Sequence, residues 1–284
     1  MKIDFLENSR LHQLFFTFQK SFSDFVLNNQ IQYDDFIALN QRKSVDYQSS
    51  FGCFEGEELV GFILNSTGLW NGEPCAYQTS IGVIPEKRRQ GIAEKLLQKS
   101  INHYKQKGIR QFLLECITTN SPALEFYKKA GYSPVRELNC FMKSKNSPLP
   151  PYRLEHDLIF EEKHHIKREK MLEYSEFIPA WQNSLDTIEH YFMKLKILRV
   201  LCGKHEAGYG IMDQQAGDIL QIVIYPEFRK QKIGTAVLDE LIQYQKHPMI
   251  KIFNIDSNAK IYTTFLMDCG FMPFISQYEM LLKL

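Results

Sequence analysis

The chain has 284 residues, of which 44% are hydrophobic and 24% charged, a composition typical of a globular protein with room for two ordinary domains. Its 34 Lys and Arg nearly balance 33 Asp and Glu, and the net charge of +1 gives no bulk attraction to nucleic acid or to a membrane surface. The cysteines form no C-x-x-C pair, the N-terminus lacks the apolar core of a signal peptide, and no apolar run is long enough to span a membrane, so we expect a cytoplasmic protein with free thiols.

The first predicted elements are a strand over Lys2–Leu6 and a helix marked by an aromatic stripe. The apolar residues of this stripe recur at helical spacing: Leu11, Leu14, Phe15, Phe18, Phe22 and Phe25. Such a stripe is typical of a core, and lining an acceptor pocket is the alternative. A second helix is expected next, then three strands with a loop over 65–74 before the third: Tyr33–Arg42, then Phe51–Phe54, Leu59–Leu64 and Ala76–Ile84.

The stretch Ile81–Ala93, I-G-V-I-P-E-K-R-R-Q-G-I-A, joins a strand to a helix through a basic turn. From Ile92 onward the apolar residues recur at helical spacing. The first N–H groups of a helix lack partners within it, the helix dipole favours negative charge there, and Gly91 lets another molecule approach the backbone. The stretch therefore predicts a phosphate cradle, and a solvated basic turn before a surface helix is the alternative.

A strand over Gln111–Ile117 and a further helix follow. The helix is expected to open at Asn120-Ser121-Pro122 with Ser121 as its N-cap, and to stop at Gly131. Alternation of strands and helices predicts an α/β fold with a mixed sheet and helices packed on its faces. The stretch 143–151, K-S-K-N-S-P-L-P-P, predicts a linker in which Lys143 and Lys145 are solvated.

Beyond the linker the pattern begins again. P-E-F-R-K-Q-K-I-G-T-A after residue 225 matches P-E-K-R-R-Q-G-I-A after residue 84. Pro226 to Gly270 spans 44 positions and Pro85 to Gly131 spans 46, so two landmarks recur at nearly one spacing. The sequence therefore predicts a tandem repeat, with domains over 1–146 and 152–284. Within the second, two helices are expected between residues 163 and 195, then strands over 198–202, 209–212 and 219–225.

Two motifs of the first repeat resemble the signatures of the GNAT superfamily of acyl-CoA N-acyltransferases. Arg88-x-x-Gly91-x-Ala93 resembles its cofactor motif [QR]-x-x-G-x-[GA]. The second motif, on the next helix, is matched by Asn120, Ala123, Tyr127, Gly131 and Tyr132. The resemblance covers about Tyr77–Met142 and implies a tandem GNAT protein, each domain a central mixed sheet flanked by helices.

The resemblance implies that acetyl-CoA binds where the strands Tyr77–Ile84 and Gln111–Ile117 splay apart. The pantetheine arm would pair with the first strand as an added strand does, and the pyrophosphate would sit on the turn. The residues implied for cofactor binding are Ile81, Gly82, Val83, Arg88, Arg89, Gln90, Gly91, Ile92, Ala93 and Asn120. No metal is implied: His164-His165 beside Glu161-Glu162 lacks ligand spacing and predicts a solvated helix start.

Tyr127 and Glu115 are the catalytic residues that the resemblance implies. Tyr127 would act as general acid toward the departing CoA thiolate, and a core tyrosine is the alternative. Glu115 would act as base on the amine, as a glutamate does at this position in ribosomal-protein N-terminal acetyltransferases. It could instead face solvent or pair with a lysine, leaving Tyr77, Thr79 or a water chain as base.

The implied activity is transfer of an acetyl group from acetyl-CoA to a primary amine of a small molecule or peptide, with no nucleic-acid or membrane partner. The alternative is a non-catalytic CoA-binding or assembly protein. In the second repeat Lys232 replaces Gly91, Leu266 replaces Tyr127 and Asn254 replaces Glu115, although Gly234 matches Ala93. We therefore expect a second domain that is folded but not catalytic, with one CoA site per chain. A monomer whose repeats form a pseudo-dimer is one arrangement that the repeat allows.

Overall fold

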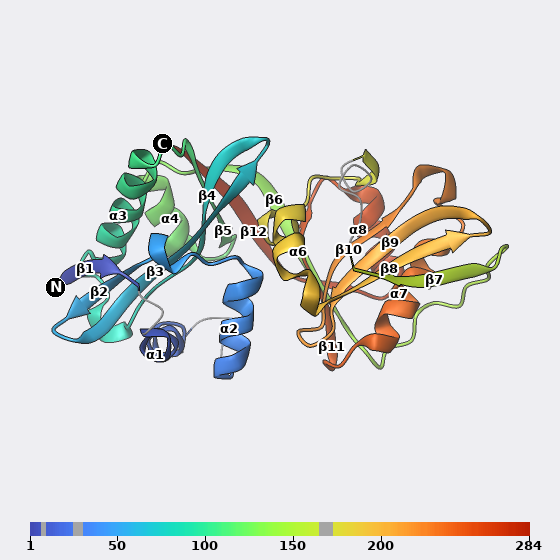
Figure 1. Ribbon diagram of the computed structural model, residues 1–284, viewed down its shortest axis with the longest axis horizontal. Coiled ribbons are helices and arrows are strands. Elements are labelled where there is room, and N and C mark those ends of the chain that lie inside the picture. Colours follow the sequence, from blue (N-terminus) through green and yellow to red (C-terminus); the bar gives the residue numbers. More distant parts are fainter. Residues whose placement is uncertain (7–9, 25–30, 165–172) are drawn as a thin grey trace. The chain divides into compact units, whose positions relative to one another are not determined.

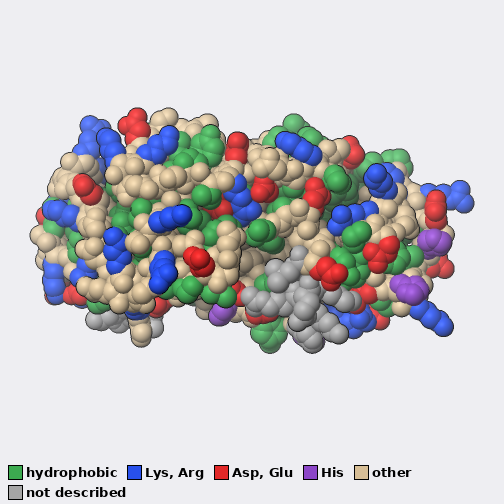
Figure 2. Space-filling model, turned by 90° about the horizontal axis from the view of Figure 1, so that it is seen from above, with side chains coloured by type: hydrophobic (Ala, Val, Ile, Leu, Met, Phe, Trp, Pro, Cys, Tyr) green, Lys and Arg blue, Asp and Glu red, His purple; other side chains and the backbone are tan. Residues whose placement is uncertain are grey.

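The computed structural model describes residues 1–6, 10–24, 31–164 and 173–284, which form two compact units. Unit 1 consists of Met1–Glu115, Glu125–Ser133 and Met280–Leu284, and unit 2 of Cys116–Leu124 and Pro134–Glu279. None of the described helices is long and apolar enough to cross a membrane. Figure 2 shows basic and acidic side chains interspersed over the described part of one face, in keeping with the net charge of +1.

Unit 1 is built on a mixed sheet in the order β1-β2-β3-β4-β5. The first four strands pair antiparallel and β4 pairs parallel with β5. The strands are β1 (Lys2–Phe5), β2 (Phe51–Glu55), β3 (Glu58–Trp70), β4 (Glu73–Val83) and β5 (Gln111–Ile117), and the helices are α1 (Leu11–Ser21), α2 (Tyr33–Arg42), α3 (Ile92–Gln106) and α4 (Ser121–Lys129).

The helices of unit 1 cover both faces of its sheet (Figure 1). The aromatic stripe of α1 packs with Phe36 of α2 against Phe62 and Leu64 of β3, so the stripe belongs to a core. The next residues along β3 face the other way: a Cβ on Gly61 would lie 3.0 Å from Ile92 of α3. The two helix pairs therefore lie on opposite faces. Phe25, the last residue expected in the stripe, lies outside the described residues.

The expectation of a loop over 65–74 is wrong, because β3 and β4 continue through this stretch as a long hairpin. Trp70 pairs with Glu73 at its end, and Asn71 and Gly72 between them have φ of 51° and 79°. Positive φ at both central residues is the requirement of a type I′ turn, and Asn-Gly is its preferred sequence. The dipeptide was therefore a hairpin signal.

Unit 2 repeats the architecture with the strand order β6-β11-β10-β9-β8-β7. Its strands are β6 (Ser133–Ser144), β7 (Leu158–Lys163), β8 (Leu195–Cys202), β9 (His205–Asp213), β10 (Asp218–Ile224) and β11 (Met249–Asp256), and its helices are α6 (Leu185–Tyr191), α7 (Ile233–Tyr244) and α8 (Lys260–Asp268). Short 3-10 turns lie at Tyr47–Ser49, Pro85–Lys87, Trp181–Asn183, Phe192–Lys194 and Pro226–Phe228.

One expectation for the second repeat is wrong, and another is only partly tested. Glu161 and Glu162 lie in strand β7, so they do not start a helix. Of the two helices expected between residues 163 and 195, α6 is present, and residues 165–172 lie outside the described part of the chain.

The two repeats exchange their last strands. β6, from the first repeat, pairs antiparallel with β11 in unit 2, and Phe141 belongs to the core of that unit. The last strand, β12 (Met272–Lys283), ends in unit 1, where the N–H of Leu284 donates to the Arg110 carbonyl at 2.8 Å. Lys143 is consequently only 4% exposed, and its Nζ donates to the Pro148 carbonyl at 3.0 Å. The expectation that Lys143 is a solvated linker residue is wrong.

Candidate active site

A gap opens in unit 1 between β4 and β5. The two strands pair only at Cys75–Gln111, Ala76–Phe112 and Tyr77–Leu113. Immediately beyond, β4 has a bulge at Thr79, because Leu64 of β3 pairs with Ser80 whereas Asn65 pairs with Gln78. A bulge bends its strand and ends regular pairing, so it accounts for the point at which β4 leaves β5.

The turn that joins β4 to α3 presents backbone to solvent. Arg89 and Gly91 have φ of 59° and 74°, and α3 begins at Ile92. When right-handed and left-handed backbone conformations alternate, successive N–H groups point into one concavity that can bind an anion. The dipole at the N-terminus of a helix also favours an anion. A Cβ built on Gly91 would meet no atom within 4 Å, so the approach to this backbone is open.

Arg88 fixes this turn in place. Its guanidinium donates to the Val83 carbonyl at 3.2 Å, to the Ser21 carbonyl at 3.0 Å, and to both carboxylate oxygens of Asp24 at 2.6 and 2.7 Å. The guanidinium holds the pKa of Asp24 below its usual value through these hydrogen bonds. Arg88 therefore links the end of β4 to the end of α1. Its neighbour Arg89 and Gly91 are the two residues of the turn with positive φ.

Tyr127 of α4 is buried and hydrogen-bonded to β4. Its ring is 6% exposed, and Gln78 Nε2 donates to Tyr127 Oη at 2.5 Å. The ring of Tyr132 packs at 5.7 Å between centroids. Because the phenolic oxygen is the acceptor in the bond from Gln78, the hydroxyl keeps its capacity to donate a proton.

Glu115 of β5 is hydrogen-bonded to the strand beside it. Tyr77 Oη donates to Glu115 Oε2, and Tyr77 is only 2% exposed. Thr79 Oγ1 donates to the Leu64 carbonyl at 3.2 Å, which engages the hydroxyl proton in the sheet. Two of the groups considered as base, Glu115 and Tyr77, are therefore in contact with each other. The third, Thr79, is instead hydrogen-bonded to the backbone of β3.

These two polar pairs lie on opposite faces of the sheet. Gln78 follows Tyr77 directly, and successive side chains of a strand point to opposite faces. Asn65, the pairing partner of Gln78, donates through Nδ2 to Ser100 Oγ of α3 at 3.1 Å, so Gln78 and Tyr127 are on the α3–α4 side. Tyr77 and Glu115 are on the α1–α2 side. Because β4 and β5 no longer pair beyond Tyr77, both pairs lie beside the point at which the two strands part.

Asn120 precedes α4 and caps it. The N–H of Ala123 donates to Asn120 Oδ1 at 3.2 Å. The expected cap, Ser121, is instead the first residue of the helix. An Asn oxygen that accepts from the third residue into a helix satisfies one of its unpaired N–H groups.

The segment that holds these features is similar to a known family. The Acetyltransferase (GNAT) family profile matches residues 10–132, which include the cradle turn and both polar pairs. The first repeat therefore resembles a GNAT domain.

Two curated relatives resemble part of the chain. The N-alpha-acetyltransferase 30 of Schizosaccharomyces pombe is 28% identical over 90 residues, covering 31% of this chain and 60% of the relative. The N-alpha-acetyltransferase of Sulfurisphaera tokodaii is 32% identical over 103 residues, covering 33% and 62%. The chain thus spans about three fifths of the length of these relatives.

A solved structure resembles the whole chain in fold. The tandem GNAT protein from the clavulanic acid biosynthesis pathway superposes with a TM-score of 0.72 at 13% identity, covering 99% of this chain and 98% of its own. At that identity the likeness concerns the fold alone, and that fold is a tandem GNAT fold.

The second repeat keeps the backbone of the GNAT turn without its glycine. Lys230 and Lys232 have φ of 61° and 63°, matching Arg89 and Gly91, and α7 begins at the next residue. Arg229 donates to the Ile224 carbonyl and to the Tyr174 carbonyl, both at 2.9 Å, as Arg88 does to its own strand end. Leu266, in place of Tyr127, is fully buried.

Two features of the site depend on residues outside the family motifs. Gln78 was missed, although a glutamine directly after the apolar run Cys75-Ala76-Tyr77 signals a side chain that needs a hydrogen-bond partner if it is buried. Tyr77 was considered only as a rival base, whereas it contacts Glu115 directly. Among the described residues no cluster of His, Cys, Asp and Glu could hold a metal ion.

Proposed function

We propose that this chain is an acyl-CoA-dependent N-acetyltransferase that transfers the acetyl group of acetyl-CoA to a primary amine. The reaction belongs to the first repeat, residues 1–146, and residues 152–284 have no catalytic step. The observation that carries the proposal is the placement of the Gln78–Tyr127 and Tyr77–Glu115 pairs on the two sides of one gap. Such a placement suits a reaction that takes a proton from one reactant and gives one to the other.

The residues of the first repeat fit an acyl-CoA. The backbone from Arg89 to Ala93 would hold the pyrophosphate, since the approach to Gly91 is open and the helix end favours anions. Ile81 and Val83, on β4 beyond the last β5 pair, would pair with the pantetheine arm. Between them a Cβ on Gly82 would lie 2.8 Å from the Phe62 ring, so the tight packing there supports a residue without a side chain. When bound, acetyl-CoA supplies a thioester carbonyl that an amine can attack.

Glu115 takes the proton of the amine in this proposal. A lysine-like ammonium has a pKa of about 10.4 and an α-ammonium one of about 7.7–8.0, so either must lose a proton before it attacks. The Tyr77 hydroxyl holds the Glu115 carboxylate in one orientation. Because this pair is on the α1–α2 face, the amine enters from that side.

Tyr127 gives a proton to the departing sulfur. The nitrogen–carbon bond forms, the carbon–sulfur bond breaks, the sulfur takes the Tyr127 hydroxyl proton, and the attacking nitrogen releases its second proton to solvent. The Gln78 amide donates to the phenolic oxygen and stabilises the negative charge left there until solvent returns a proton. A backbone N–H of β4 beyond Tyr77 stabilises the oxygen of the attacked carbonyl.

The acceptor is a primary amine of a peptide or small molecule. A peptide α-amino group is the first to test, because two relatives are named N-alpha-acetyltransferases. The proposed location is the cytoplasm, supported by six cysteines that are all free and buried. No nucleic-acid or membrane partner is proposed.

We expect CoA thiol to be released from acetyl-CoA only when an acceptor amine is present. The experiment incubates the full chain with acetyl-CoA and a panel of unblocked peptides, the same peptides with blocked N-termini, and small amines. Thiol is measured colorimetrically and the acetylated product by mass spectrometry. Tight binding of acetyl-CoA without turnover on any amine would favour the non-catalytic alternative.

A further inference from the structure

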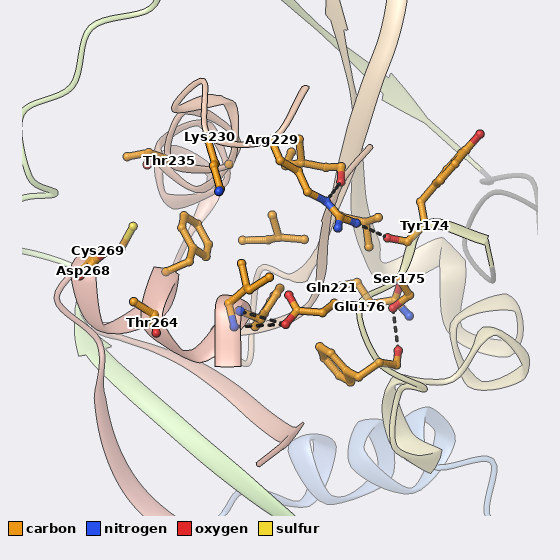
Figure 3. A pocket seen from close by; sticks show the side chains of 18 of the residues that line it. Tyr174, Ser175, Glu176, Gln221, Arg229, Lys230, Thr235, Thr264, Asp268 and Cys269 are labelled. Atoms are coloured by element: carbon orange, nitrogen blue, oxygen red, sulfur yellow. Dashed lines mark hydrogen bonds between the residues drawn. The ribbon is translucent and has the colours of Figure 1, made fainter. Parts of the chain in front are cut away.

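A cavity of about 650 Å³ lies within unit 2 (Figure 3). Its walls come from β10 after its first residues, from the turn before α7, from α7 itself, from α8 and from residues 174–179. This volume is in the range of sites that enclose small molecules.

The frame of the cavity matches the gap of the first repeat. β10 pairs with β11 at Asp218–Lys251, and its bulge lies at Leu220, where Ile219 pairs with Met212 and Gln221 with Ile211. The equivalent bulge in the first repeat is at Thr79. The cavity therefore opens at the same point of the fold, but with different side chains around it.

The edge of β10 is occupied by the protein itself. Tyr262 of α8 lines the cavity together with Ile222, the counterpart of Ile81, and the backbone of Ile222 is close enough to lower the pKa of the Tyr262 hydroxyl, which burial raises. An extended amide chain that pairs with a strand needs this backbone group. Tyr262 therefore disfavours a ligand that binds as an added strand, and Lys232 places a side chain where Gly91 leaves the backbone open.

The walls of the cavity are largely apolar. They include the side chains of Phe177, Leu220, Ile222, Ile224, Phe228 and Phe265. The proton donor of the first repeat is replaced by Leu266, which is fully buried beneath them. Such walls favour a hydrocarbon chain, and Leu266 offers no proton at the position that Tyr127 has in the first repeat.

The charged residues that line the cavity are four cations, Arg229, Lys230, Lys232 and Lys260, and two acids, Glu176 and Asp268. Lys230, Lys232 and Lys260 line it, and no ion pair of these lysines is found in the part of the chain that the structure describes. Figure 3 shows the Lys230 side chain extending into the cavity. Of the acidic residues on the wall, Glu176 is engaged at the start of α8, where its Oε1 accepts from the N–H of Ile261 at 3.2 Å.

We propose that this cavity binds an anionic amphiphile, a hydrocarbon chain with a phosphate or carboxylate head, without converting it. The chain packs on the apolar walls and the head meets Lys230 and Lys232 at the α7 N-terminus, where the helix dipole adds to their charge. This site is separate from the acetyl-CoA site proposed in the first repeat.

Titration calorimetry of the full chain with decyl phosphate and with decanoate tests the proposal. We expect one of the two to bind once per chain, and the tighter one identifies the head group. Replacing Lys230→Gln and Lys232→Gln together should weaken it by about tenfold or more, because two charged contacts are lost. Arg89→Gln, the counterpart of Lys230→Gln in the first repeat, should leave this binding unchanged.

A second pair of variants tests the location. A Cβ on Gly234 would lie 3.4 Å from the Phe265 ring, an ordinary contact, so Gly234→Ala should fold and bind normally. Gly234→Leu extends into the cavity and should abolish binding, with folding checked by circular dichroism. Unchanged affinity in Gly234→Leu, no binding of either probe, or displacement of the probe by acetyl-CoA would each overturn the proposal.

Discussion

Gln78 and Tyr77 show how adjacent residues of one strand serve two sides of a site. Gln78 donates to Tyr127 on one face, and Tyr77 donates to Glu115 on the other. Neither bond could be inferred from the spacing of the family motifs, because both depend on the bulge at Thr79 and the end of pairing beside it. The proposed acid and base are thus each oriented by a neighbour on β4.

Replacing Tyr127→Phe should lower kcat about 10²–10⁴-fold with little change in the dissociation constant of acetyl-CoA, because only the donated proton is lost. Steady-state kinetics and calorimetry measure the two quantities. Tyr104→Phe is the matched control, since Tyr104 is also fully buried on α3 but its hydroxyl donates to the Ser49 carbonyl at 3.4 Å, within the core. Full kcat in Tyr127→Phe would leave Tyr127 a packing role.

At the scale of elements, α3 is bounded by two glycines in the same backbone conformation. Gly91 before it and Gly108 after it have φ of 74° and 73°, and a Cβ on either would meet no atom within 4 Å. A side chain at either position should therefore cost about 1–2 kcal/mol of backbone strain. Only Gly91 lies at the helix end that favours anions.

Replacing Gly91→Glu should abolish acetyl-CoA binding, because a carboxylate then faces the pyrophosphate. Gly108→Glu should lose similar stability but bind normally, so the pair separates a ligand effect from a folding effect. Calorimetry and thermal unfolding of both variants check this. Equal affinity in the two variants would contradict the assignment of the cradle.

A buried ion pair joins β6 to the part of β12 that lies in unit 2. Arg136 of β6 donates to both oxygens of Glu279 on β12, at 2.7 and 3.0 Å, and to Asp256 of β11 at 3.5 Å. Glu279 is fully buried, and its burial raises its pKa, an effect that the Arg136 guanidinium partly offsets. Because the pKa of Glu279 is higher in the folded than in the unfolded chain, its contribution to stability is fully present at a pH below the unfolded-state pKa. This contribution is lost as the pH rises through the folded-state pKa.

We expect Arg136→Met to destabilise the protein by about 3–5 kcal/mol at pH 8, since it leaves an uncompensated buried carboxylate. Removing the cation raises the Glu279 pKa further, so the loss should shrink toward pH 5. Denaturant unfolding at both pH values measures it. Combining Arg136→Met with Glu279→Leu should recover most of the loss; a loss independent of pH would show that Glu279 is not the residue responsible.

At the scale of the whole molecule, the sequence predicts local structure and family motifs well and the partnership of strands poorly. Helical spacing located α2 at Tyr33–Arg42, and the repeated landmarks predicted the tandem fold. Nothing local distinguishes β6 from a strand that stays in its own repeat, because its neighbour is set by packing far along the chain. The burial of Lys143, which lies on β6, could not be inferred either. The prolines that follow it in the sequence indicate a linker, whereas its burial depends on the strand with which β6 pairs.

Because we expect the two repeats to have diverged in chemistry, we expect one acetyl-CoA site per chain. Lys232 keeps the left-handed turn but adds a side chain, and Leu266 removes the proton donor, so the second repeat should hold no acetyl-CoA. Calorimetric titration of the full chain should therefore end at one acetyl-CoA per chain, and Gly91→Glu should reduce it to none. In a chain that combines Gly91→Glu with Tyr127→Phe, turnover should disappear. A stoichiometry of two, or turnover that survives both changes, would mean that the second repeat is itself an active site and that its apolar cavity accepts the cofactor despite Tyr262.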